Sequence, residues 1–223
     1  MSTYFSPDFL QFFKELAANN HKEWFDENRK RYETVVKKPF EVFVQHAIDE
    51  MAKLDPRLSE LDPKKCIFRI NRDIRFSKDK APYKLNRSAA ISVGGRNDMI
   101  EPGIYFEIGP EHVRFYTGVY SPDKDSLMKV RKHIASNLKE FSSVITDKEF
   151  EKIWGEIQGD KNKIIDKSLK GPAETQALLY NKNFYVYCTY KAELVHGPIL
   201  QEMAKAYKAA QPFMNFMASA LKN

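Results

Sequence analysis

A short stretch of the chain, Arg69 to Arg87, gathers most of the side chains that could do chemistry. Its seven cations are Arg69, Arg72, Arg75, Lys78, Lys80, Lys84 and Arg87, and its two acids are Asp73 and Asp79. Seven minus two leaves +5, nearly the whole net charge of +6 carried by the 223 residues. Guanidinium forks bind planar oxyanions such as phosphate and carboxylate, and lysines add point charge. The stretch is therefore the first candidate for an anion site.

The first half of this stretch has the alternation of a β-strand. From Ile67 to Phe76, apolar and polar side chains alternate. This pattern places Phe68, Ile70, Ile74 and Phe76 on one face. Arg72 falls in the middle of that apolar face. An unpaired charge there would be costly, so we expect Arg72 to meet a carboxylate, several carbonyls or a bound anion. The opposite face places Asp73 between Arg69 and Arg75.

The second half reads as a turn that leaves the strand. Ser77 to Lys80 is polar, and Pro82 fixes its own φ and lacks an N–H donor. Tyr83 and Lys84 follow as a ring and a cation. The sequence thus gives a set of candidate ligand-binding residues: Arg69, Arg72, Arg75, Lys78, Lys80, Tyr83 and Lys84.

Three hypotheses fit this segment. The first is a binding module for a ligand that bears phosphate or carboxylate. The second is an enzyme acting on such a substrate, with Asp73 or Asp79 as acid/base or metal ligand and the arginines stabilising developing charge. The third is a structural or protein-interaction domain without a small ligand, in which the segment is tied to a neighbouring helix through acids such as Glu23, Asp26 or Glu27. The reaction, the ligand and the oligomeric state are not indicated.

The elements that must position this segment begin with helices. Ser6-Pro7-Asp8 is a strong helix start, and Phe9, Phe12, Phe13 and Leu16 recur at helical spacing after it. Asn20 and Glu23 have the spacing of a capping box for a second helix, which ends before Pro39. A third helix is expected from about Pro39 to Leu54.

Strands follow, and helices close the chain. Residues 89–93 read as a strand, and 104–108 with 113–120 alternate cleanly across Gly109-Pro110-Glu111, as in an antiparallel hairpin. Ser121-Pro122-Asp123 predicts the start of another helix, and residues 150–157 read as a helix. Residues 184–190 read as a Tyr-rich strand, and packing is enough to explain its tyrosine rings. A last helix, about 198–221, contains Pro212. This order predicts an α+β fold with a central antiparallel sheet flanked by N-terminal and C-terminal helices.

Composition narrows the class of protein. No repeat or linker interrupts the chain, so we expect one domain, 1–223. Cys66 and Cys188 are its two cysteines, without a Cys/His cluster or an HExxH pair, so neither a disulfide scaffold nor a metal site is predicted, and no cofactor is indicated. Without a signal peptide or an apolar run long enough for a membrane, we expect a soluble cytoplasmic protein. A nucleic-acid partner is compatible with the charge, but no known nucleic-acid motif supports it.

Three segments resemble a known family. His21 to Glu33, Arg69 to Lys84 and Tyr120-Ser121-Pro122 are similar in order and spacing to the domain of unknown function family numbered 2461. The resemblance covers most of the chain and implies a family without implying an activity. It implies that these residues stand at family motif positions: Asn20, Trp24, Phe25, Tyr32, Arg72, Asp73, Arg75, Phe76, Lys78, Asp79, Lys80, Pro82, Tyr83 and Lys84. A Pro-Lys-Gly-Phe-like stretch of the family's later half is replaced here by Leu169-Lys170-Gly171-Pro172.

Overall fold

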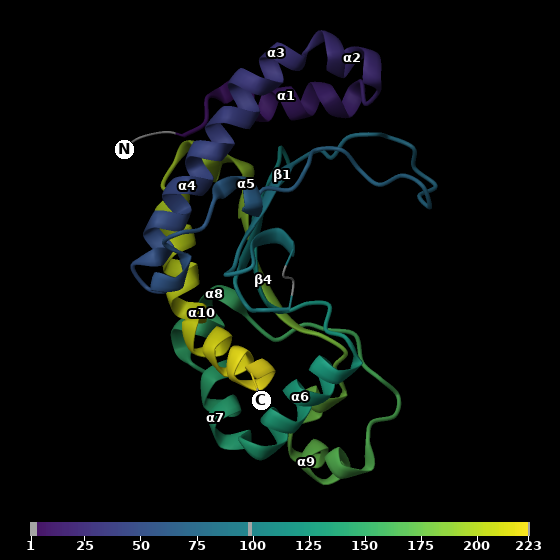
Figure 1. Ribbon diagram of the computed structural model, residues 1–223, viewed down its shortest axis with the longest axis vertical. Coiled ribbons are helices and arrows are strands. Elements are labelled where there is room, and N and C mark those ends of the chain that lie inside the picture. Colours follow the sequence, from purple (N-terminus) through teal and green to yellow (C-terminus); the bar gives the residue numbers. More distant parts are fainter. Residues whose placement is uncertain (1–3, 98–99, 223) are drawn as a thin grey trace. The chain divides into compact units, whose positions relative to one another are not determined.

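The computed structural model describes residues 4–97 and 100–222. Its secondary structure is α+β, as the sequence predicts: along the chain, N-terminal helices precede the strands of a four-stranded antiparallel sheet, and further helices follow them (Figure 1). Among the described residues, no helix combines the length and the apolar character that crossing a membrane requires.

The N-terminal helices are α1 (Pro7–Ala18), α2 (Lys22–Glu27), α3 (Arg29–Arg31) and α4 (Lys38–Ala52). A π-helical segment, Tyr32–Lys37, joins α3 to α4, so the predicted second helix is divided into shorter pieces. The predicted capping box is wrong. His21 caps α2, because its Nδ1 accepts from the Trp24 N–H, whereas Asn20 points its side chain elsewhere.

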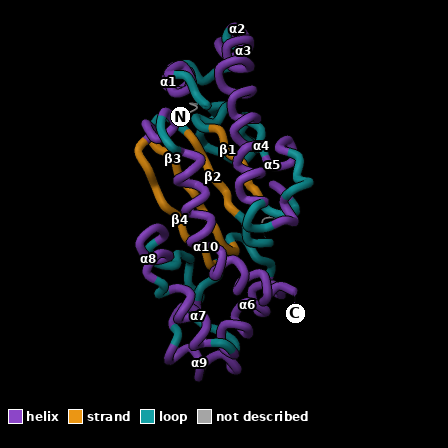
Figure 2. The backbone as a smooth tube through the Cα atoms, turned by 90° about the vertical axis from the view of Figure 1, so that its left-hand side faces the viewer, coloured by secondary structure: helices purple, strands orange, loops and turns teal. Residues whose placement is uncertain are grey.

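The strands are β1 (Arg87–Ile91), β2 (Ile104–Ile108), β3 (His112–Val119) and β4 (Phe184–Lys191), and they lie side by side in the order β1-β2-β3-β4 (Figure 2). The expected hairpin of β2 and β3 is present. Gly118 in β3 has φ +120°, and a Cβ there would lie 2.2 Å from the Phe184 carbonyl oxygen. Only glycine allows β4 to approach so closely.

The remaining helices are α5 (Pro63–Cys66), α6 (Lys124–Ser136), α7 (Leu138–Ile145), α8 (Lys148–Trp154), α9 (Lys170–Thr175) and α10 (Ile199–Lys222). Short 3-10 turns occupy Pro56–Leu58, Gly95–Asn97, Lys167–Leu169, Ala177–Tyr180 and Ala192–His196. A helix follows Ser121-Pro122-Asp123 as predicted, but it begins at Lys124, because Asp123 and not Ser121 caps α6 by accepting from the Ser126 N–H at 2.7 Å. Pro212 lies inside α10.

The chain divides into two compact units. Unit 1 contains residues 1–91, 105–115 and 189–204, and unit 2 contains 92–104, 116–188 and 205–223. The expectation of one domain stays a prediction. The candidate segment, Arg69 to Arg87, belongs entirely to unit 1.

Unit 1 has an aromatic core. Phe40 and Phe43 of α4 pack against Phe106 of β2, with ring centroids 5.8 and 5.6 Å apart. Phe12 of α1 contacts Tyr32 at 5.7 Å. All five rings are buried, so this core holds α1 and α4 in place, and one end of the candidate segment contacts it through Arg87, whose guanidinium lies over the Phe40 ring.

Unit 2 has a separate core built on the second part of α10. Phe213 packs against Phe150 of α8, and Phe216 packs against Phe141 of α7. Trp154 donates its indole N–H to the Ala206 carbonyl at 3.0 Å, which satisfies the one polar group of a buried ring. None of the candidate ligand-binding residues lies in this unit.

The predicted strand over Ile67–Phe76 is only partly correct. Two isolated antiparallel bridges, Ile67 with Ala89 and Asn71 with Tyr83, replace a continuous strand. The alternation nevertheless holds as far as Ile74, because Arg69, Asn71 and Asp73 are exposed and Ile70 is buried. Phe76 was expected on the apolar face, and this is wrong: its side chain is 95% exposed.

Candidate functional site

The candidate segment forms a hairpin, Ile67–Ala89, that we call the basic hairpin. Its two arms are joined by backbone hydrogen bonds from the Phe68 N–H to the Ser88 carbonyl, from Lys84 to Ile70, and from Arg72 to Pro82, at 2.8 to 3.0 Å. In Figure 1 its two arms form a long projection that extends past α1 and α2. We call residues 73–81, beyond the last of these bonds, the tip.

Ion pairs within the hairpin fix the shape of the tip. Arg72 Nη1 lies 2.5 Å from the Asp79 carboxylate and also donates to the Ala81 carbonyl at 3.0 Å. Arg75 forms a two-pronged pair with Asp73, at 3.0 and 2.7 Å. The partner that Arg72 was expected to need is therefore an acid of the same hairpin, and not an acid of α2.

The two aspartates of the tip are acceptors held by these pairs. The pKa of Asp73 lies below its ordinary value because Arg75 donates from its side chain and from its backbone N–H. The pKa of Asp79 is lowered first by the Ala81 N–H and then by Arg72. Both carboxylates are thus ionised at neutral pH and satisfied by donors.

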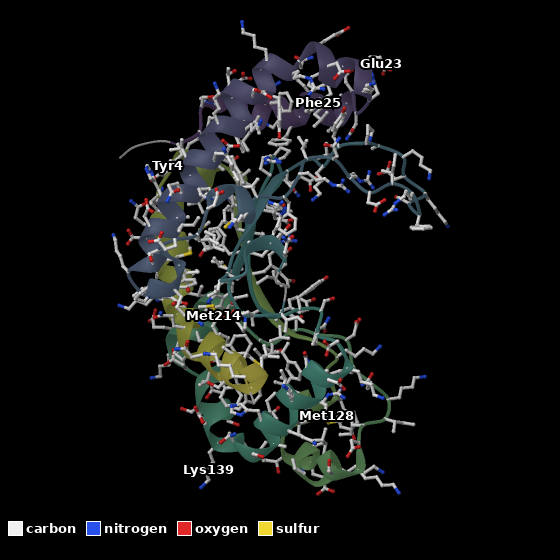
Figure 3. All side chains as sticks on the ribbon, viewed as in Figure 1. Tyr4, Glu23, Phe25, Met128, Lys139 and Met214 are labelled. Carbon is white, nitrogen blue, oxygen red and sulfur yellow. The ribbon has the colours of Figure 1, made fainter. Side chains whose placement is uncertain are left out.

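A separate contact joins the basic hairpin to the start of α2. The Asn20 amide donates to the Tyr83 carbonyl at 3.0 Å, and its oxygen accepts from the Tyr83 N–H at 3.1 Å. Phe25 of α2, labelled in Figure 3, stacks on the Tyr83 ring with centroids 4.1 Å apart and planes 17° apart. The side chain of Asn20 thereby replaces the strand partner that Tyr83 lacks on this side.

Three cations gather at the base of the hairpin, where it leaves the sheet. Lys84 is half-buried, with its ammonium 5.3 Å from the centre of the Phe68 ring. Burial lowers the pKa of Lys84, the nearby charges of Arg87 and Arg69 lower it further, and Glu107 opposes them. Arg87 and Arg69 therefore both repel the Lys84 ammonium.

Arg87 is the buried member of this group, only 4% exposed. It donates to the Phe68 carbonyl at 2.9 Å, and its guanidinium lies 5.2 Å from the centre of the Phe40 ring. Its Nε meets no hydrogen-bond acceptor in the described part of the chain. Burial also lowers the pKa of Arg87. A guanidinium buried in this way keeps a positive potential at the base of the hairpin.

The structure divides the sequence-predicted site residues into two groups. Arg72, Arg75 and Tyr83 are engaged within the hairpin or with α2, together with Asp73 and Asp79. The second group consists of Arg69, Lys78, Lys80 and Lys84. Within residues 4–97 and 100–222, no carboxylate lies at ion-pair distance from any of these four cations, although Lys80 donates to the Ile74 carbonyl at 3.0 Å.

One polar cluster near the base was not predicted. Glu107 of β2 lies 3.0 Å from His112 Nε2 and 3.8 Å from the guanidinium of Arg114, both on β3. Asn86 donates to the same carboxylate at 3.4 Å. The sequence carries only part of the signal, because Glu107 and Arg114 lie in the strands predicted at 104–108 and 113–120, whereas His112 directly precedes the second of them.

The other sequence-based interpretations concern residues away from the hairpin. Tyr185 and Tyr187 of the Tyr-rich strand do pack on other tyrosines, with Tyr120 at 5.2 Å and Tyr116 at 5.6 Å, but Tyr187 and Tyr120 remain exposed. The described residues contain no group of three or more His, Cys, Asp or Glu side chains able to hold a metal ion.

Comparison with known proteins places the chain in a family. Residues 8–216 match the family described as "Conserved hypothetical protein (DUF2461)", and the chain belongs to that family. The family predicted from the three motif segments is thereby confirmed. A comparison with curated proteins found no match.

Proposed function

We propose that the basic hairpin binds a phosphate- or carboxylate-bearing ligand, with Arg69 and Lys84 at its base as the principal contacts. One observation carries this proposal: Lys84 is half-buried, and its pKa is lowered first by burial and then by the neighbouring charges of Arg87 and Arg69. Grouping like charges in this way is unfavourable in the unliganded protein. A bound anion would remove the repulsion, and a lysine and an arginine would together supply point charge and paired donors.

The remaining motif residues have two different roles in this proposal. Lys78 and Lys80 of the tip provide further positive charge that attracts the anionic ligand. Arg72, Arg75 and Tyr83 are positioning residues, because their contacts hold the tip and the base in one conformation. The structural hypothesis thus describes one part of the motif and the binding hypothesis describes the other.

A catalytic role for Asp73 or Asp79 has less support. The lowered pKa values of both groups argue against a general acid, which must be protonated near neutral pH, and make each carboxylate a weak general base. Among the described residues, neither belongs to a group of three or more side chains able to hold a metal ion. Each carboxylate also accepts hydrogen bonds from an arginine. We therefore favour the binding module over the enzyme.

We also propose that the protein is cytoplasmic, as expected from its sequence. Cys66 and Cys188 are both buried thiols that form no disulfide, as is common in a reducing compartment.

The pH dependence of lysine labelling tests the proposed site. Because the pKa of Lys84 is lowered, its amine becomes nucleophilic at a lower pH than that of an exposed lysine. Acetic anhydride labelling read by mass spectrometry should therefore give Lys84 a lower midpoint pH than Lys163, which is exposed in unit 2. Inorganic phosphate should raise the midpoint of Lys84, because an adjacent anion stabilises the ammonium form.

Lys163 is the matched control, and its midpoint should not change with phosphate. Arg69→Gln should reduce the effect of phosphate on Lys84. The proposal is contradicted if phosphate leaves the Lys84 midpoint unchanged, or if it shifts Lys163 equally.

A further inference from the structure

Phe76 is the most exposed large hydrophobic side chain among the described residues. It is 95% exposed at the tip of the basic hairpin, and the Arg75 guanidinium lies 5.9 Å from the centre of its ring. A phenylalanine in this position adds nothing to the core and leaves its ring in water. The ring is therefore available to a binding partner, with a cation beside it.

The cations of the hairpin are spread along its length. Arg69 and Lys84 stand at the base, whereas Lys78 and Lys80 stand in the tip. Asp73, the first residue of the tip, is four residue steps along the chain from Arg69, which corresponds to about 13 Å of extended backbone. One phosphate group cannot contact both ends of such an element. The distribution favours an anion that repeats along a chain.

We propose that the ligand of the basic hairpin is single-stranded nucleic acid, with one base stacked on Phe76 and successive phosphates against the cations from tip to base. This inference rests on the proposed function and names its ligand. Single strands are bound by this combination of cations along the backbone and aromatic rings against exposed base faces. In a duplex the base faces are already covered by their neighbours.

An anionic membrane fits the observations less well. A lipid surface that accepted Phe76 would meet the narrow tip of the hairpin. Arg69 and Lys84, at the base, would then stand beyond the headgroups. A polymer lying along the hairpin can reach the ring and both groups of cations.

The test measures binding of a labelled oligothymidylate of about 20 nucleotides, longer than a typical single binding site. The full-length protein, Phe76→Ala, Phe76→Trp and Phe76→Leu are compared by fluorescence anisotropy. Phe76→Ala should raise the Kd about 5- to 100-fold, the range expected when one base–aromatic contact is lost. Phe76→Trp should retain wild-type affinity, whereas Phe76→Leu should not, because leucine keeps the bulk without the ring.

Two controls separate stacking from charge. Ile164→Ala removes an 82% exposed side chain from unit 2 and should leave the Kd unchanged. An abasic oligomer of the same length should bind more weakly than oligothymidylate, and Phe76→Ala should not weaken it further. Phe76→Ala should also leave the salt dependence of binding unaltered, whereas Lys80→Ala should reduce it.

The inference is overturned if Phe76→Ala binds oligothymidylate like wild type, or if an abasic strand or a duplex binds as tightly. It is also overturned if Phe76→Ala loses binding to phosphatidylserine vesicles while keeping oligonucleotide affinity. Acetic anhydride labelling of Lys84 in the presence of inorganic phosphate distinguishes failure of this inference from failure of the proposed function. If phosphate protects Lys84 but Phe76 has no effect, the proposed function stands and the nucleic-acid ligand is wrong.

Discussion

At the scale of single residues, Tyr83 is the point where the basic hairpin meets the N-terminal helices. Its backbone makes two hydrogen bonds with Asn20, and its ring stacks on Phe25. Such hydrogen bonds contribute about 0.5–1.5 kcal/mol each, and a stacked aromatic pair contributes about as much beyond its buried area. These contacts fix the direction of the basic hairpin relative to α2.

Asn20→Ala should therefore destabilise the protein by about 1–3 kcal/mol, because it removes two hydrogen bonds and leaves a partly buried N–H and carbonyl of Tyr83 without partners. Urea unfolding measures the change, and amide hydrogen exchange should show lost protection at Tyr83 and Lys84. Asn215→Ala, at an exposed position of α10, is the matched control and should have little effect. Equal stability of Asn20→Ala and wild type would contradict this role for Asn20.

The sequence predicted the chemistry of these residues better than their contacts. Arg72 was expected to meet a carboxylate, several carbonyls or a bound anion, and it meets the Asp79 carboxylate and the Ala81 carbonyl. The choice of Asp79 over an acid of α2 depends on where the hairpin turns. Asn20 has the spacing of a cap, yet its amide pairs with a backbone 63 residues away. A local pattern cannot distinguish these outcomes, because the competing partner comes from a distant segment.

At the scale of elements, the basic hairpin is a structure that stabilises its own tip. The bonds of Arg72 with Asp79 and of Arg75 with Asp73 lie within residues 72–79 and involve exposed carboxylates. Exposed ion pairs add little to global stability, because solvent screens them. We infer that these pairs select one conformation of the tip and do not hold the fold together.

Arg72→Ala should accordingly leave the melting temperature close to that of wild type while the tip loses its ordered conformation. Hydrogen exchange should speed up at Ala81, whose N–H is bonded to Asp79, and remain unchanged in α4. Asp79→Asn should act in the same direction and more weakly, because the amide keeps an acceptor oxygen. A sharp fall in melting temperature for Arg72→Ala would show that the pair is part of the core framework.

The alternation of the hairpin was predictable, and its end was not. Side-chain exposure follows the period of a strand from Phe68 to Ile74, as the sequence indicates. At Phe76 the pattern continues in the sequence, but the chain has already turned between Ile74 and Ser77, whose backbone groups are hydrogen-bonded. A periodic pattern predicts which side chains share a face only where another element covers that face.

At the scale of the whole molecule, the decisive property is that positive charge is concentrated in one element. The segment Arg69 to Arg87 carries a net charge of +5 out of the +6 of the whole chain, and four of its cations, Arg69, Lys78, Lys80 and Lys84, have no acidic partner among the described residues. An anion should therefore bind at one place and not over the surface generally. The family match over residues 8–216 includes this whole element and most of each compact unit.

The most direct test of this account is an NMR titration of the whole chain with inorganic phosphate. Wild type, Lys84→Gln and Lys163→Gln are compared through their backbone amide shifts; glutamine keeps much of the side-chain length of lysine while removing the charge. We predict that shift changes concentrate at Arg69, Lys84 and their neighbours and saturate in wild type and Lys163→Gln, but not in Lys84→Gln. Changes spread evenly over exposed lysines, or an unaltered titration of Lys84→Gln, would contradict an anion site at the base of the basic hairpin.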